Sequence, residues 1–378
     1  MDGQRHVQAC AFLISRSKRA QQMALSDLVI EGTHLPGVSV IIGNYNQAGF
    51  VADAIASVAR QSYRNFECVI VDDRSADDSA ARITQSLAEM HDERFRFIPR
   101  TDNGGQMAAM MTGLDATTAP FLAFVDADDI WHPEFLEAHI AAHLSRAGAA
   151  GVSTSDMALI EEDGTMISGG SPGFRAWNPS SPDVADYVSN ELGEGGTGYI
   201  FVERFIAHRW LWSSTSGMMF RRSALQLLRP GTPERIKICA DNYLAVAAHM
   251  LGGTVRIERT LGHYRLHGAN SWAKHAFVGR GTTLGAARPD VERAVRSALI
   301  ERFCAAADDL MRIMSRSDLA RILVAYLGWG AAIALHDSNA AARKMLGGWL
   351  TPQRRLAWFV MRKIPLSWRP REFRPPPE

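Results

Sequence analysis

The sequence contains only four cysteines, Cys10, Cys68, Cys239 and Cys304, and no two of them form a CxxC pair. Compact zinc sites and thiol-redox motifs need closely spaced cysteines, so neither kind of site is predicted. Scattered cysteines in a chain of 378 residues also make no disulfide scaffold. They favour a reducing compartment, and we therefore expect the chain to be cytoplasmic.

Long hydrophobic runs are also missing. The apolar residues 11–14 are too few for a signal peptide, and Arg16 interrupts the end of that run. The longest apolar stretch, residues 322–335, is shorter than the roughly 18–20 residues that span a bilayer. We expect it to form a buried helix, with an interfacial or re-entrant helix as the alternative.

The chain has no strong excess of charge of one sign. Its formal net charge is +1, so a nucleic-acid partner is not predicted. The exception is the C-terminal end, where aromatic and basic residues interleave. The aromatic ones are Trp329, Trp349, Trp358, Phe359 and Trp368, and the basic ones are Arg354, Arg355, Arg362, Lys363, Arg369, Arg371 and Arg374. This composition predicts either an amphipathic segment on the inner face of an anionic membrane or a helix packed on the protein with a solvated basic face.

Hydrophobic patterning predicts an α/β fold. Short apolar runs at 38–42, 68–71, 95–98 and 121–125 are typical of buried strands, and helical patterns lie between them at 48–61 and 106–116. This alternation predicts a doubly wound, mostly parallel, Rossmann-like sheet. We expect an N-terminal extension over 1–35, a catalytic domain over 36–275, and a helical C-terminal region over 276–378 with a basic amphipathic tail.

Polar residues follow three of the predicted strands, at 44–46, 72–73 and 126–129. Ligands of parallel sheets bind outside the carboxyl ends of the strands, where these clusters would meet. A single acidic cluster in this position is more often a solvated turn. Clusters after several strands of one sheet favour a binding site instead.

The residue types at this edge indicate a nucleotide diphosphate and a metal. Asp126 and Asp128 flank one small residue, and paired carboxylates of this kind hold Mg²⁺ or Mn²⁺ on phosphate oxygens. Asp72 and Asp73 are acceptors suited to a pyrimidine N3–H or a ribose hydroxyl. Tyr45 either stacks on the base or packs within its loop.

Two later segments also carry candidate residues. Asp241 begins an apolar helical run, where it serves either as a general base or as a helix cap. His263 and His267 lie in a later segment, and the Gly/Asn/Ser surroundings of His267 suit a metal or phosphate contact.

The stretches VSVIIGNYNQ, VIVDDRSAD and FVDADD, at 38–47, 69–77 and 124–129, resemble the family-2 glycosyltransferases of the A-type nucleotide-sugar fold. The resemblance is strong over about 36–140 and weaker to about 272, where YRLHGANS is similar to a frequent YRxHxxN segment of that family. It implies a metal-dependent, inverting hexosyltransferase using Mn²⁺ or Mg²⁺. It also implies a nucleotide-sugar donor, which we expect to be UDP-linked, and a carbohydrate or lipid-linked acceptor in surface polysaccharide or glycolipid assembly.

The same resemblance assigns roles to individual residues. Asp241 stands at the position of the catalytic base. The implied metal ligands are Asp126, Asp128 and His267. The implied donor-binding residues are Tyr45, Asn46, Asp72, Asp73, Asn103, Gln106 and Asp126.

Some residues depart from the family pattern. Met110 and Met111 replace an Arg-Asn pair, which puts a donor contact from that helix in doubt, and Ala240 replaces the Glu before the base. A sugar nucleotidyltransferase is an alternative, although it would need a GxGxR-type loop where this chain has 43–47, GNYNQ. A non-catalytic nucleotide-sugar binding protein is the other alternative.

Overall fold

The computed structural model describes most of the chain after residue 32. The described residues are 33–145, 150–171, 174, 178, 180, 188–192, 198–205, 210–270, 276–277, 281–282, 289–364, 368 and 370. Most of the predicted N-terminal extension lies outside these residues, as do Arg369, Arg371 and Arg374 of the basic tail.

The first half of the fold is a parallel sheet with the strand order β3-β2-β1-β4. All its neighbouring strands run parallel, as the sequence predicted. The strands are β1 (Val38–Asn44), β2 (Phe66–Asp72), β3 (Phe95–Pro99) and β4 (Phe121–Asp126).

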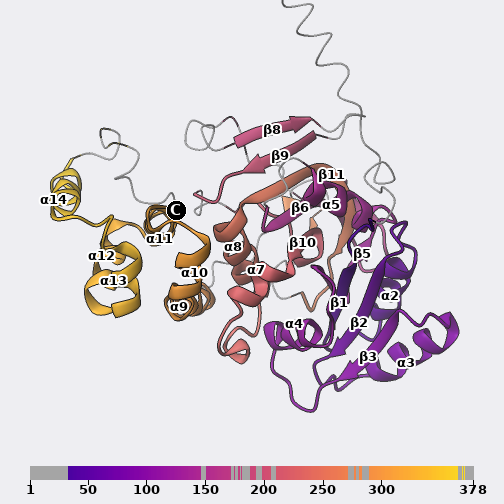
Figure 1. The fold of residues 1–378 in the computed structure, drawn as a ribbon. Helices are drawn as coiled ribbons and strands as arrows, with labels where there is room; N and C mark the ends of the chain where they lie inside the picture. The colour runs from indigo at the N-terminus through magenta and orange to yellow at the C-terminus, as the bar shows by residue number, and fades with distance from the viewer. Residues whose placement is uncertain are drawn as a thin grey trace, which may run out of the picture.

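Helices cover both faces of this sheet, which explains why its strands are mostly apolar. Successive β1 side chains point to opposite faces. Ile41 joins one hydrophobic core with α4 (Gln106–Asp115), whereas Ile42 joins a second core with α2 (Val51–Ala59). Figure 1 shows this α/β unit in indigo and purple.

An antiparallel extension continues the sheet beyond β4, giving a mixed sheet with 11 strands in the described part of the chain. β10 (Met218–Arg221) pairs antiparallel with both β4 and β6 (Val152–Ile160), and β11 (Thr254–Arg265) runs parallel to β6. β4, β6 and β11 therefore point the same way. The outer strands are β9 (Gly198–Val202) and β8 (Val188–Leu192).

Further helices and short strands complete the α/β part. The helices are α3 (Ser79–Met90), α5 (Phe135–Leu144), α7 (Arg222–Leu227) and α8 (Ala240–Gly252), with the 3₁₀ turns η3 (Thr215–Gly217) and η4 (Pro233–Arg235). The short strands are β5 (Ile130–Trp131), β7 (Met166–Ser168), β12 (Ala276–Phe277) and β13 (Gly281–Thr282).

The C-terminal region is helical, as predicted, and shares the core that α4 and α8 build on one sheet face. Figure 1 shows these helices side by side, with α14 at the outer end. They are α9 (Pro289–Ala305), α10 (Ala307–Ile313), α11 (Arg316–Leu327), α12 (Trp329–Ser338), α13 (Ala340–Leu346) and α14 (Pro352–Met361).

The apolar stretch 322–335 is buried in part but is not one helix. Gly328 ends α11 at a φ of 77°, a backbone conformation that glycine adopts without strain. In the described residues no single helix has the length and hydropathy to cross a membrane. The pair α11 and α12 meets those criteria only when taken together, and it is bent by 118°.

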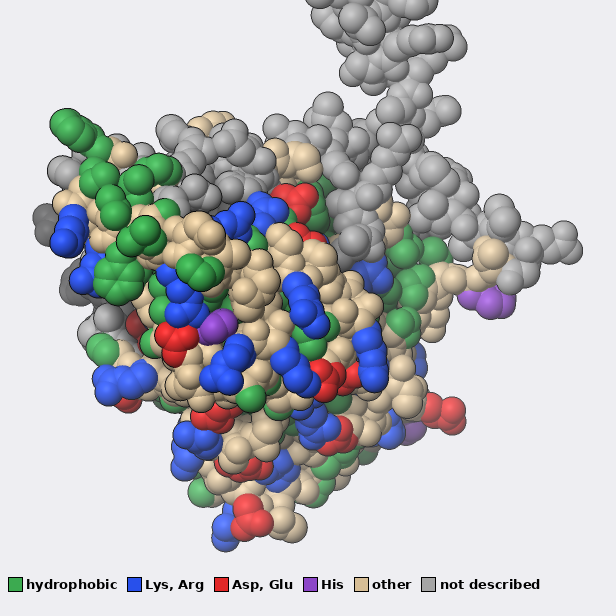
Figure 2. Space-filling view, turned by 60° about the vertical axis from the view of Figure 1, so that its left-hand side comes forward, with side chains coloured by type: hydrophobic (Ala, Val, Ile, Leu, Met, Phe, Trp, Pro, Cys, Tyr) green, Lys and Arg blue, Asp and Glu red, His purple; other side chains and the backbone are tan. Residues whose placement is uncertain are grey.

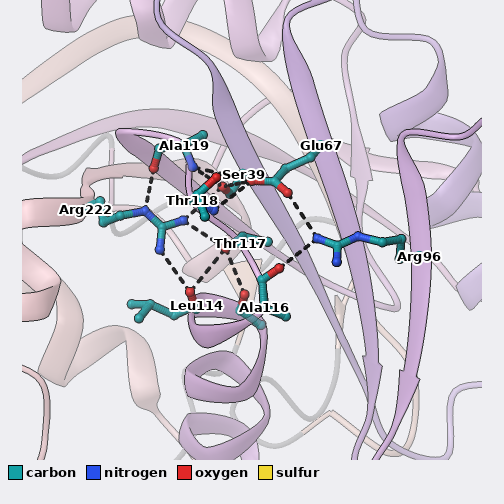
Figure 3. Close-up of polar contacts among 10 residues, drawn as sticks. Ser39, Glu67, Arg96, Leu114, Ala116, Thr117, Thr118, Ala119 and Arg222 are labelled. Carbon is teal, nitrogen blue, oxygen red and sulfur yellow. Dashed lines mark hydrogen bonds and ion pairs between the residues drawn. The ribbon is translucent and has the colours of Figure 1, made fainter.

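A polar network ties the amino-terminal edge of the sheet together (Figure 3). The buried Arg222 guanidinium donates to Ser39 Oγ at 2.9 Å, to Thr117 Oγ1 at 2.8 Å and to the Leu114 carbonyl at 2.9 Å. Glu67 accepts from Ser39 Oγ at 2.8 Å and from the Thr118 N–H at 2.9 Å. These bonds join α7 to the loop before β4, at the edge opposite the acidic strand ends.

Candidate active site

Strand direction brings distant segments to one edge of the sheet. β4 and β11 point the same way, so the residues after both strands emerge at that edge. α8 runs back before β11 begins, which places its amino terminus at the same edge. Asp126, Asp128, Asp241 and His267 are therefore gathered there, although the sequence separates them widely.

Asp128 and His267 are in direct contact. His267 Nε2 lies 2.9 Å from Asp128 Oδ2, and the His267 ring packs against Phe50 with ring centroids 4.9 Å apart. The His267 side chain is 4% exposed and that of Asp128 is 15% exposed. The contact brings together two of the three predicted metal ligands.

Asp126, the third predicted ligand, carries a proton unusually readily. Burial, together with the neighbouring carboxylates of Asp128 and Asp241, raises the pKa of Asp126 to about 7. Its backbone N–H donates to Ser216 Oγ at 3.0 Å, which fixes the end of β4. A cation at this edge would relieve the repulsion that these carboxylates impose on one another.

Asp129 has a different environment from its neighbours. It is 1% exposed, and its Oδ1 accepts the Arg265 backbone N–H at 3.0 Å. Burial, with the charges of Asp128 and Asp126, raises the Asp129 pKa well above its ordinary value. Asp129 therefore joins the β4 turn to β11.

Arg265 supports this turn and was not predicted as a site residue. Its Nε donates to the Asp128 carbonyl at 3.0 Å, and its Nη2 pairs with Asp53 Oδ2 of α2 at 2.9 Å. The side chain is almost fully buried. Arg265 thus holds the backbone that presents Asp128, and its position two residues before His267 in YRLHGANS was the available signal.

Asp241 lies in the first turn of α8 but does not cap it. The cap position belongs to Cys239, which has a φ of 58°, and Asp241 Oδ1 accepts the adjacent Asn242 N–H at 2.9 Å. Burial raises the pKa of Asp241 to about 6. A carboxylate with that pKa is mostly ionised at neutral pH and is more basic than an ordinary aspartate.

Gln106 joins Asp126 to the amino terminus of α8, where Asp241 lies. Its Nε2 donates to Asp126 Oδ1 at 3.1 Å, and its Oε1 accepts the Ala240 N–H at 3.0 Å. The bridge requires a close approach at Gly105, whose φ is 86° and where a Cβ would lie 2.6 Å from Lys237 Cα. The α4 and α8 amino termini are thereby fixed relative to each other.

Asp72 organises the loop after β1. Its Oδ1 accepts from Asn44 Nδ2 at 2.6 Å and from Ser75 Oγ at 2.5 Å, and its Oδ2 accepts the Ser75 N–H at 2.9 Å. Asn46, with a φ of 53°, donates its N–H to Ser75 Oγ at 2.8 Å. An ionised carboxylate offers about four acceptor positions, so one on Asp72 Oδ2 is left for a ligand.

Asp73 organises the loop before α4. Its Oδ1 accepts from Gly104 N–H at 3.0 Å and pairs with Arg100 Nε at 2.8 Å, and its Oδ2 accepts from Gly105 N–H at 2.6 Å. Asn103 Nδ2 donates to the Asp73 carbonyl at 3.1 Å. One acceptor position on Oδ2 again remains by the same count.

The other residues singled out from the sequence differ in exposure. Tyr45 is 50% exposed, so its ring is accessible for stacking. Met110 and Met111 are 1% and 2% exposed and belong to the core, so their side chains face away from a donor at the sheet edge. His263 lies near His132, with ring centroids 5.8 Å apart, and takes no part in the Asp128 contact.

The residues at this edge fit a divalent cation. Among the described residues no group of three or more His, Cys, Asp or Glu side chains has the arrangement of a complete metal cage. Mg²⁺ and Mn²⁺ do not need one, because they keep waters and substrate phosphates beside one or two protein ligands. The Asp128 and His267 side chains, 2.9 Å apart, would supply such protein ligands.

Comparison with known proteins identifies relatives of the α/β part. The sequence model of Glycosyl transferase family 2 matches residues 39–158. The uncharacterized glycosyltransferase alr2836 of Nostoc sp. (strain PCC 7120) is 31% identical over 234 residues, which are 62% of this chain and 66% of that protein.

Two further likenesses are more limited. The Escherichia coli UDP-Glc:alpha-D-GlcNAc-diphosphoundecaprenol beta-1,3-glucosyltransferase WfgD is 33% identical over 104 residues, 28% of this chain and 38% of that protein. The structure of mannosyltransferase PcManGT from Pyrobaculum calidifontis, in complex with GDP-Man and Mn²⁺, covers 91% of this chain and 92% of that one, with a TM-score of 0.44 and 17% identity. The chain thus spans less than two thirds of the length of the Nostoc relative and of WfgD.

Proposed function

Because the chain belongs to glycosyltransferase family 2, we propose that it transfers a sugar from a nucleotide-sugar donor to an acceptor hydroxyl, with inversion at the anomeric carbon. The observation that carries the proposal is the Gln106 bridge, which fixes Asp241 at the α8 terminus beside Asp126 at the end of β4. Direct displacement needs a base and a diphosphate-binding carboxylate that lie near each other.

Asp241 is the proposed general base. Its carboxylate takes the proton of the acceptor hydroxyl while the acceptor oxygen forms a bond to the anomeric carbon. The bond from that carbon to the diphosphate oxygen breaks, and its electron pair leaves with the nucleoside diphosphate. A pKa of about 6 leaves Asp241 ionised at neutral pH and strong enough to accept the proton as the bond forms.

Asp128 and His267 are the proposed ligands of a divalent cation, with Asp126 as a third. When bound, the ion would supply positive charge for the leaving diphosphate. Carboxylate oxygens suit both Mg²⁺ and Mn²⁺, and the imidazole of His267 favours Mn²⁺, which binds nitrogen ligands more readily. Arg265 and Ser216 keep the β4 turn in place through the Asp128 carbonyl and the Asp126 N–H.

UDP is the proposed nucleotide. Asp72 and Asp73 each retain one acceptor position on Oδ2, enough to receive the single N3–H of uracil. Tyr45, half exposed on the neighbouring loop, would stack on the base, and Asn46 and Asn103 support the adjoining loops through their bonds to Ser75 and Asp73. The Escherichia coli relative, named for a UDP-Glc donor, supports this choice.

The acceptor is proposed to be a carbohydrate, free or lipid-linked, in surface polysaccharide or glycolipid assembly. The support is the relative's name, which describes transfer of glucose to a diphosphoundecaprenol-linked sugar. A hexose is the transferred sugar proposed on the same ground.

A donor screen tests the proposal. The chain is incubated with Mn²⁺ and UDP-, GDP-, CDP- or dTDP-hexoses, and release of the nucleoside diphosphate is measured with and without short saccharide acceptors. Release from a UDP-sugar that rises with acceptor and disappears in Asp241→Asn is expected. Donor binding without release from any sugar nucleotide would instead describe a non-catalytic binding protein.

A further inference from the structure

Helix α14 has two apolar faces, and among the described residues only one of them packs against the protein. Ala357, Trp358 and Met361 pack against the core of the helical region. Trp358 approaches α12 closely, since a Cβ added to Gly330 would lie 3.5 Å from its ring. The position of α14 is therefore set by this inner face.

The outer face of α14 is formed by Leu356, Phe359 and Val360, whose spacing places them on one side of the helix. These side chains are 67%, 48% and 52% exposed. Trp368, which follows the helix in the chain, is 79% exposed. Large apolar groups gathered in this way on a surface mark an interaction site rather than scattered exposure.

Basic residues surround the outer face. Arg354 lies over the ring of Trp349 and Arg362 over the ring of Phe359, at 4.5 and 4.6 Å from the ring centroids, and Lys363 is exposed. Arg355 pairs with Asp337 at 2.9 Å. Segment 351–370 contains no Asp or Glu.

The figures place this surface at the margin of the molecule. Figure 1 shows α14 at the outer end of the helical region, away from β1 to β4. Figure 2, turned to bring that side forward, shows hydrophobic side chains next to Lys and Arg side chains at the upper left.

We propose that the outer face of α14 docks on the surface of an anionic lipid bilayer. Its apolar side chains enter the boundary between headgroups and acyl chains, and Arg354, Arg362 and Lys363 meet the lipid phosphates. Charge complementarity favours a bilayer, because a lipid surface supplies diffuse negative charge beside apolar matter. This inference does not depend on the proposed sugar transfer.

The test is flotation of the full chain with vesicles of phosphatidylcholine alone or of phosphatidylcholine with phosphatidylglycerol. Binding is expected with the anionic vesicles and should weaken as salt is raised. Phe359→Ser with Val360→Ser, and separately Arg362→Glu with Lys363→Glu, should each lower the partition coefficient by about tenfold or more. Circular dichroism confirms that each variant is folded.

Matched control variants distinguish binding through the outer face of α14 from non-specific binding to vesicles. Ile313→Ser removes an apolar side chain that is 63% exposed at the end of α10, and Arg82→Glu reverses an exposed charge on α3. Both controls should bind vesicles like the unaltered chain. Equal binding by all variants, indifference to lipid charge, or self-association of the chain in light scattering that the α14 changes abolish would overturn the proposal.

Discussion

His267 Nε2 lies 2.9 Å from Asp128 Oδ2, although 139 positions separate the two residues. The contact follows from strand direction, since β10 pairs antiparallel with both β4 and β6, and β11 runs parallel to β6. Two strands that point the same way deliver a carboxylate and an imidazole to one edge. A cation held there would be bound by both halves of the sheet.

His267→Ala is expected to weaken the response to Mn²⁺. Removing one of few protein ligands should raise the Mn²⁺ concentration that half-saturates the chain by about 10–100-fold. His263→Ala is the matched control, because His263 lies on the same strand region but outside the Asp128 contact. The effect is measured by calorimetric titration of Mn²⁺ into the chain at a fixed UDP concentration. An unchanged titration in His267→Ala would exclude His267 as a ligand.

The pH dependence of transfer should report Asp241. The base acts as a carboxylate, and burial raises its pKa to about 6, so protonation removes activity as the pH falls below that value. With donor and metal saturating, kcat/KM for the acceptor should rise with pH and level off above about 7. A rate that stays level down to about pH 5 is inconsistent with this assignment.

Asp129→Asn should change how stability depends on pH. The folded-state pKa of Asp129 is raised above its unfolded value by burial and by Asp128, so the folded state holds the proton more tightly. The free energy of unfolding then falls as pH rises from about 4 through the folded-state pKa. Asparagine keeps an acceptor for the Arg265 N–H and has no proton to lose, so the variant should gain stability relative to the parent as pH rises.

Denaturant unfolding in EDTA at several pH values measures this difference. Asp163→Asn is the control with the opposite sign, because hydrogen bonds from Thr165 lower the Asp163 pKa. That variant should lose stability relative to the parent as pH rises through the ordinary Asp range. Parallel curves for Asp129→Asn and the parent chain would show that Asp129 is not protonated in the folded state.

Arg222→Met should destabilise the fold without touching the acidic edge. Arg222 donates to Ser39, Thr117 and the Leu114 carbonyl, and the methionine would leave these buried acceptors without it. The expected loss is about 3 kcal/mol of unfolding free energy, against a change within about 0.5 kcal/mol for Arg82→Met on exposed α3. Urea unfolding of both variants measures this difference. Equal unfolding midpoints for Arg222→Met and Arg82→Met would mean that the network in Figure 3 adds little stability.

The parallel half of the fold could be predicted from sequence because its strands are buried on both faces. Ile41 and Ile42 enter opposite cores, so the run 38–42 that contains them is apolar apart from Ser39 and stands out. The antiparallel half has no such signal. β10 is only four residues long, and its insertion between β4 and β6 depends on long-range pairing.

The site was predictable in part for similar reasons. Acidic residues directly after an apolar strand, such as Asp126 and Asp128, are visible in sequence, and their contact with His267 is a matter of topology. Arg265 had only its place in YRLHGANS as a signal and Ser216 had none, because they act through a backbone carbonyl and a backbone N–H. The break at Gly328 within 322–335 was likewise hidden by continuous hydrophobicity.

The central claim is that Asp241 is the base of a sugar transfer at this edge. The most direct measurement compares the unaltered chain with Asp241→Asn for release of UDP from a UDP-sugar with Mn²⁺ and acceptor, alongside calorimetric binding of UDP. Turnover should fall by about 10²–10⁴-fold while UDP affinity and the unfolding transition stay the same. Retained turnover in Asp241→Asn, or a loss of UDP affinity together with folding, would contradict it.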